Sequence, residues 1–156
     1  MAADAHRPLR AALLGGFIAG TIDVGAAALI FGAGPIVILQ AIASGVLGRA
    51  AFFDGAASAA LGLILQWAMS WIIAAVYVAA ARYLSALGRH WLTSGLGYGV
   101  VVFSAMNYVV VPLSAAYPRN PFTPRTFIES LLAMLLFGVL VAFFARRAWS
   151  SRAGEK

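Results

Sequence analysis

The chain has 156 residues, of which 63% are hydrophobic and 10% charged, and its formal net charge is +6. A soluble domain carries about a quarter charged residues, so residues 1–156 are expected to form a single all-α integral membrane domain. The absence of cysteine excludes disulfides and thiolate chemistry, and the basic residues flank apolar segments instead of forming a nucleic-acid-binding patch.

The first apolar segment, residues 11–31, is long enough for a membrane-spanning helix, which needs about 20 residues. A cleaved signal peptide is the alternative, with His6, Arg7 and Arg10 as its charged start. The length of the segment, the carboxylate of Asp23 within it and the apolar sequence that follows all favour a retained first span.

A second apolar segment, residues 35–53, is ambiguous because Gln40, Ser44 and Arg49 interrupt it. Three later segments are also long enough to span a membrane, and none of them contains a basic residue. They are residues 56–81, 94–114 and 127–145. The chain therefore has four or five spans, depending on the second segment.

The distribution of basic residues separates the two topologies. With four spans, the amino terminus, the loop at 82–92 and the carboxyl tail share one side, which then holds eight of the eleven basic residues. With five spans the two sides hold five and six. Basic residues concentrate in the cytoplasm, so four spans with both termini cytoplasmic are favoured. Residues 35–48 then form a short outer-side helix, opened by Gly34-Pro35, that is interfacial or re-entrant.

Local signals predict where three of these helices begin or end. Asp54 precedes the second long span as its N-cap. Thr126 and Glu129 have the spacing of a capping box for the last span, with Thr126 at the N-cap and Glu129 at N3. Pro112 is expected to kink or end the third span.

Small residues at intervals of four predict where the spans pack. Gly16 and Gly20 lie on one face of the first span, and Gly95 and Gly99 lie on one face of the third. In lipid, helices associate through such faces. Packing within one four-helix bundle is the favoured interpretation, and a dimer interface is the alternative.

Four polar residues are expected to converge in the outer half of the membrane. At 1.5 Å per residue, Asp23, Asn107 and Gln66 fall at similar depths, below the segment that carries Arg49. A bare carboxylate near the bilayer centre costs about 2.5–3.5 kcal/mol, so Asp23 must be neutral, paired, hydrogen-bonded or hydrated. Both a proton-carrying site and a structural interhelical hydrogen bond explain it.

Other site chemistries find little support in the sequence. His6 and His90 lie at the cytoplasmic edge without metal-ligand spacing, and neither a two-aspartate nor a serine catalytic arrangement is present. No cofactor, no metal and no enzymatic activity are therefore expected.

Several segments together resemble a family of small bacterial inner-membrane proteins whose activity is uncharacterised. They are GGFIAGTIDVGAA, GPIVILQAIASGVLG, LGLILQW, YGVVVFSAMNYVVVPLS and LLFGVLVAFFARR, which cover most of the chain. The resemblance implies a four-span protein of the bacterial inner membrane. It implies no activity.

Two functions follow as hypotheses. The favoured one is a structural or accessory membrane component that contacts lipid and acts alone, as a homo-oligomer or with another membrane protein. The alternative is a small proton-coupled transporter or channel component that uses Asp23 in a polar pocket.

Overall fold

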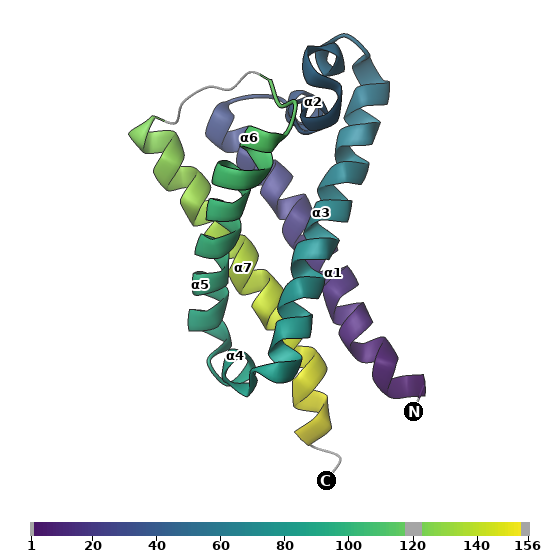
Figure 1. Cartoon of the computed structure of the whole chain (residues 1–156), viewed down its shortest axis with the longest axis vertical. Coiled ribbons are helices and arrows are strands. Elements are labelled where there is room, and N and C mark those ends of the chain that lie inside the picture. Colours follow the sequence, from purple (N-terminus) through teal and green to yellow (C-terminus); the bar gives the residue numbers. More distant parts are fainter. Residues whose placement is uncertain (1, 118–122, 154–156) are drawn as a thin grey trace.

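The computed structural model describes residues 2–117 and 123–153, and this part of the chain is helical without strands (Figure 1). Two of the basic residues on which the charge count depends, Arg119 and Lys156, lie outside the described residues. The elements are α1 (Ala2–Phe31), α2 (Pro35–Leu47), the 3-10 turn η1 (Gly48–Phe52), α3 (Gly55–Tyr83), α4 (Ser85–Arg89), α5 (Trp91–Ala105), the π-helical η2 (Met106–Val110), α6 (Val111–Leu113) and α7 (Pro124–Ala153).

Five helical segments in the described residues are long and apolar enough to cross a membrane. They are Pro8–Phe31, Pro35–Phe52, Gly55–Tyr83, Trp91–Leu113 and Pro124–Arg147. Large apolar side chains point out of the bundle, with Leu29 85%, Ile64 63% and Leu132 58% exposed. A surface of this kind fits a membrane-embedded protein, because lipid rather than water covers it.

Four of the segments run along the long axis of the molecule, and the fifth does not. Figure 1 shows α1, α3, α5 and α7 as the long helices, with the start of α1 and the end of α7 at the same end. At the opposite end α2 is seen nearly end-on, so it lies across the bundle. Gly34 is its N-cap, in an extended conformation, and Pro35 occupies the first turn as expected.

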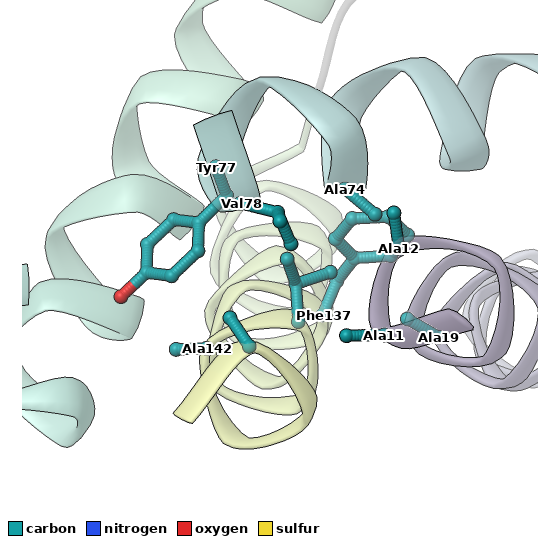
Figure 2. Close-up of a cluster of buried hydrophobic side chains, with 10 residues drawn as sticks. Ala11, Ala12, Ala19, Ala74, Tyr77, Val78, Phe137 and Ala142 are labelled. Carbon is teal, nitrogen blue, oxygen red and sulfur yellow. The ribbon is translucent and has the colours of Figure 1, made fainter. Parts of the chain in front are cut away.

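The core is built from small side chains where α1, α3 and α7 meet. Its buried members are Ala11, Ala12, Ala19, Ala74, Tyr77, Val78, Phe137, Val141, Ala142 and Ala145, most of which Figure 2 labels. Alanine allows helix axes to approach closely, so dispersion contacts between backbones hold this bundle together where lipid supplies no hydrophobic driving force.

The predicted glycine faces are both used inside the bundle. A Cβ at Gly16 would lie 2.8 Å from the carbonyl oxygen of Ser70, and one at Gly20 would overlap the Ser70 hydroxyl. On α5, Gly95 and Gly99 face α7, with a Cβ at Gly95 placed 2.9 Å from the Cα of Val139. The favoured interpretation of these faces, packing within one bundle, therefore matches the contacts.

Two further glycines allow close crossings that the sequence analysis did not single out. A Cβ at Gly138 would overlap the backbone of Gly95 and Gly99, so α5 and α7 cross glycine against glycine. A Cβ at Gly62 would overlap the carbonyl of Leu39, where α2 rests on α3. Any side chain at either position requires a backbone to move.

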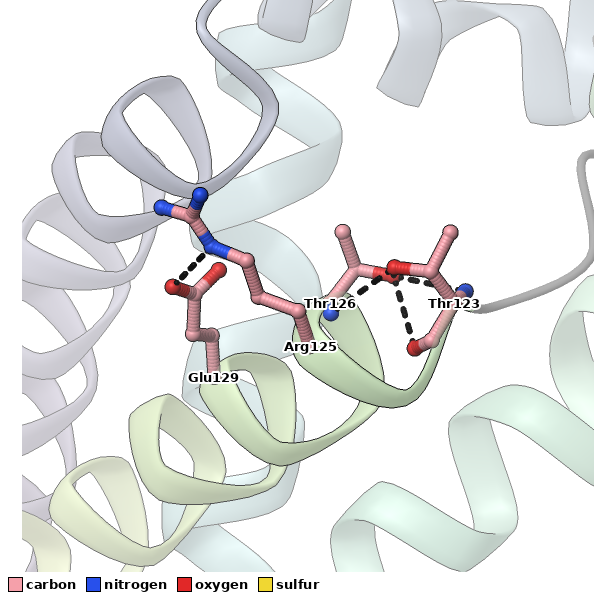
Figure 3. A network of polar contacts seen from close by, with 4 residues as sticks. All are labelled: Thr123, Arg125, Thr126 and Glu129. Carbon is pink, nitrogen blue, oxygen red and sulfur yellow. Dashed lines mark hydrogen bonds and ion pairs between the residues drawn. The ribbon is translucent and has the colours of Figure 1, made fainter.

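The predicted capping box of the last span is wrong by one helical turn. α7 begins at Pro124, and Thr123 and Thr126 cap it reciprocally, each backbone N–H donating to the other hydroxyl at 3.0 and 3.2 Å (Figure 3). Proline favours the first helical position and holds the preceding residue outside the helix, which makes Thr123 the N-cap. Glu129 lies beyond the first turn and pairs with Arg125 instead.

The other two end signals are correct in position and different in detail. Asp54 occupies the N-cap of α3, but its side chain makes no capping hydrogen bond. The third span ends at Leu113, just after Pro112, and its last turns widen into η2, where the Val111 N–H donates to Met106 O. Since proline removes a donor and its ring crowds the carbonyl four residues earlier, a wider turn accommodates it.

Candidate functional site

The candidate site is a polar contact between α1 and α3. The side-chain nitrogen Nε2 of Gln66 donates to Oδ2 of Asp23 at 3.0 Å and to the carbonyl of Gly20 at 3.1 Å. Gly20 has no side chain and lies one turn before Asp23, so α3 comes close enough for one amide to reach both acceptors. Asp23 thus has an amide partner, as one of the predicted pairings required.

Two further hydrogen bonds from α3 to α1 lie along the same interface, which we call the α1–α3 seam. The indole nitrogen of Trp71 donates to the carbonyl of Leu13 at 3.1 Å, and that of Trp67 to the hydroxyl of Thr21 at 3.4 Å. The rings of Phe17 and Trp67 stack with centroids 5.0 Å apart. α3 therefore donates to α1 over several turns, and the bond to Asp23 belongs to this line of contacts.

A small cavity lies beside the carboxylate. Its volume is about 30 Å³, and α5, η2 and α7 complete its walls. The lining residues are Asp23, Gln66, Met69, Ser70, Ile73, Val102, Met106, Met134 and Phe137. A void needs about 10–15 Å³ to hold one water molecule, so this cavity has room for a water or two and for nothing of substrate size.

Asn107 does not take part in the site, although it lies at the expected level. Its neighbour Met106 lines the cavity beside Asp23, whereas the Asn107 amide donates to the carbonyl of Phe103 at 2.8 Å, in its own helix. Consecutive residues of a helix point in directions about 100° apart. The π-helical turn that begins at Met106 sets which of them faces inward.

Arg49 also lies elsewhere. Its guanidinium stacks on the ring of Tyr117, 4.8 Å from the centroid, in an exposed position on η1. Cation–π contacts of this kind favour arginine. The structure thus brings Asp23 and Gln66 together and leaves Asn107 and Arg49 with other partners.

A second polar cluster, which sequence reasoning missed, fixes α2 to the bundle. The hydroxyl of Ser44 accepts from the Tyr117 N–H at 3.0 Å, and the Ala115 N–H donates to Gly45 O at 2.9 Å. On the same face, Gln40 donates to Gly55 O at 3.0 Å. Gln40 and Ser44 are both buried and four residues apart, a spacing from which an inward polar face could have been predicted.

Among the described residues, no group of three or more His, Cys, Asp or Glu side chains could hold a metal ion. Comparisons with family models, with curated proteins and with solved structures find no match for this chain. The site must therefore be interpreted from its own geometry.

Proposed function

We propose that this chain is a four-span protein of the bacterial inner membrane, with both termini in the cytoplasm and a structural or accessory function without catalysis. The family resemblance and the distribution of basic residues support the membrane and the orientation. The position of α2 across the end of the long helices supports four spans (Figure 1).

The surface of α2 supports a segment in contact with lipid. Its polar side chains, Gln40 and Ser44, face the bundle, while Ile36 (62% exposed) and Val46 (64% exposed) face outward. A helix that lay on the surface in water would have the opposite pattern. We infer that α2 is immersed at the outer boundary of the membrane as a re-entrant or deeply interfacial helix.

One observation supports the accessory function: Asp23 and the glycine faces at Gly16, Gly20, Gly95 and Gly99 make their contacts within a single chain. The seam from Gln66 to Asp23, the fit of Gly20 against Ser70 and the crossing at Gly138 all hold the bundle together. The cavity at Asp23 is too small for a substrate. A rigid bundle of this kind suits a component that supports a partner or the bilayer, and any partner would meet the apolar outer surface.

A proton-coupled transporter or channel component is the second candidate. The observation that favours it is the carboxylate itself, because an asparagine at position 23 could accept the same hydrogen bond from Gln66 without the cost of a charge in lipid. The cavity beside it is large enough for water, and a π-helical turn, a feature frequent at functional sites, contributes Met106 to its wall.

Proton flux separates the two functions. The full chain is reconstituted in liposomes that contain a pH-sensitive dye, a pH gradient is applied, and the wild type is compared with Asp23→Asn and with protein-free liposomes. The accessory function predicts the same slow leak in all three. Flux above the protein-free rate that Asp23→Asn abolishes would replace it with the transport function.

A partner is sought by purification in mild detergent. Because Gly16 and Gly20 contact Ser70 inside the bundle, enlarging them would disturb the fold itself. Substitutions on the outer surface, such as Ile64→Ala, are therefore the appropriate probes of a partner or of a homo-oligomer.

A further inference from the structure

An open groove lies between the second half of α1 and the first half of α7. Its volume is about 470 Å³, within the range of sites that hold small ligands. Its apolar walls are Ala26, Leu29 and Ile30 of α1 and Leu132, Ala133 and Leu136 of α7. Arg125 and Glu129 complete the lining.

The groove lies at one end of the contact between the two helices. At the other end they pack closely, and a Cβ at Gly15 would lie 3.1 Å from Cβ of Phe144. Near the start of α7 the facing side chains leave the groove between them. The groove is open and its lining is mainly apolar, as an acyl chain requires.

Its charged end carries a donor and an acceptor in fixed positions. Nε of Arg125 donates to Oε1 of Glu129 at 2.8 Å, and the two terminal nitrogens of Arg125 point away from this carboxylate (Figure 3). The Arg125 side chain is 82% exposed. The other carboxylate oxygen, Oε2 of Glu129, is buried and has no hydrogen-bond partner among the described residues.

This arrangement selects for a headgroup that has both signs of charge. The terminal nitrogens of Arg125 are donors suited to a phosphate, and a buried carboxylate oxygen without a partner is unfavourable until a donor reaches it. A purely anionic headgroup would satisfy Arg125 but would meet the negative charge of Glu129. A headgroup with a phosphate and an N–H-bearing cation on a short linker satisfies both.

We propose that the groove binds one phospholipid with a primary ammonium headgroup, as in phosphatidylethanolamine. The phosphate accepts from the terminal nitrogens of Arg125, the ammonium donates to the carboxylate of Glu129, whose side chain is 32% exposed, and one acyl chain lies along Leu132 and Leu29. Arg125 is the second residue of the apolar segment of α7, so these contacts fall at the membrane boundary. Phosphatidylcholine carries the same charges but has no N–H to donate.

The test compares headgroups that differ in one property. The full chain in detergent receives phosphatidylethanolamine, its N,N-dimethyl derivative, phosphatidylcholine or phosphatidylglycerol with identical acyl chains, and native mass spectrometry measures each binding constant. We expect phosphatidylethanolamine to bind about tenfold more tightly than phosphatidylcholine, the factor that corresponds to about one hydrogen bond to a charged group. Equal binding of these two lipids would overturn the proposal.

Two variants test the headgroup contacts of Glu129 and Arg125, and a third serves as a control. Glu129→Gln is expected to remove the preference for ethanolamine over choline, and Arg125→Gln is expected to weaken the binding of both. Arg89→Gln removes an exposed positive charge at the opposite end and should change neither. A preference that survives both Glu129→Gln and Arg125→Gln would overturn the proposal.

The acyl-chain contact needs a variant of its own. Leu132→Trp fills the groove from a side chain that is 58% exposed and leaves the buried core untouched. We expect it to weaken phosphatidylethanolamine binding while the melting temperature without added lipid stays unchanged. Unchanged binding in this variant would place the lipid elsewhere.

Discussion

The amide of Gln66 holds two groups of α1 at once, the carboxylate of Asp23 at 3.0 Å and the carbonyl of Gly20 at 3.1 Å. Side-chain hydrogen bonds between transmembrane helices contribute about 0.6 kcal/mol on average to the free energy of unfolding, and about 1.7 kcal/mol at most. The hydrogen bond itself is therefore weak. Its loss matters more, because the carboxylate of Asp23 would then lie in the membrane without a partner.

Replacement of Gln66 by leucine tests this contact. Leucine keeps much of the volume and removes both bonds, so Asp23 is left in lipid without its partner. We expect a loss of about 1–2 kcal/mol in the free energy of unfolding, measured by denaturant titration in detergent. Asp23→Asn keeps an acceptor and should be neutral or stabilising. In the Asp23→Asn background, Gln66→Leu should cost less than in the wild type, and strict additivity would contradict this account.

The glycine crossing of α5 and α7 gives a second prediction. Gly138→Ala places a methyl group on the backbone of Gly95 and Gly99, and overpacking of this kind typically costs about 1–3 kcal/mol. Gly97→Ala is the matched control on α5, because a Cβ there meets no atom within 4 Å. The control should be neutral, or stabilising by up to about 1 kcal/mol. Thermal unfolding in detergent measures both, and equal melting temperatures would argue against the crossing.

The hydrogen bond between Ser44 of α2 and the Tyr117 N–H gives a third prediction. Ser44→Ala removes the acceptor of the Tyr117 N–H at a side chain that is fully buried, and the loss of such a hydrogen bond costs about 0.5–1.5 kcal/mol. Ser104→Ala is the control, since its exposed hydroxyl donates only to the carbonyl one turn earlier in its own helix. Its effect should stay within about 0.5 kcal/mol. Hydrogen exchange should also rise in α2 of the Ser44 variant and remain unchanged in the control.

The four-span topology is tested with single cysteines, which the cysteine-free chain accepts without background labelling. Gly34 and Gly88 have open space around a Cβ, and Phe53 is 83% exposed. In bacterial cells, an impermeant maleimide should label Gly34→Cys and Phe53→Cys from outside, and Gly88→Cys only after permeabilisation. Gly34 and Phe53 on opposite sides would instead mean that α2 crosses the membrane as a fifth span.

The sequence predicts features that depend on position along a helix. Apolar length locates the long helices to within a few residues, and small residues four apart locate the faces at Gly16 and Gly95. Rise per residue gives the common depth of Asp23, Gln66 and Asn107. These quantities are one-dimensional, so a single chain suffices to obtain them.

It does not predict features that depend on rotation about a helix axis. Depth alone could not tell that Met106 rather than Asn107 would face the cavity, because the π-helical turn before Pro112 alters the rotation. Nor could it pair Arg49 with Tyr117, which requires the relative position of two loops. Gly138 was missed because it has no glycine four residues away, although Ala142 continues the same small face.

The position of α7 has a consequence for the order in which the bundle forms. α7 packs against both α1 and α5, yet it is synthesised after both of them, since chains emerge from the amino terminus. Until it inserts, the Gly95–Gly99 face of α5 is without the helix that it fits. α1 and α3 can join as soon as α3 has entered the bilayer, whereas α5 must wait there for α7.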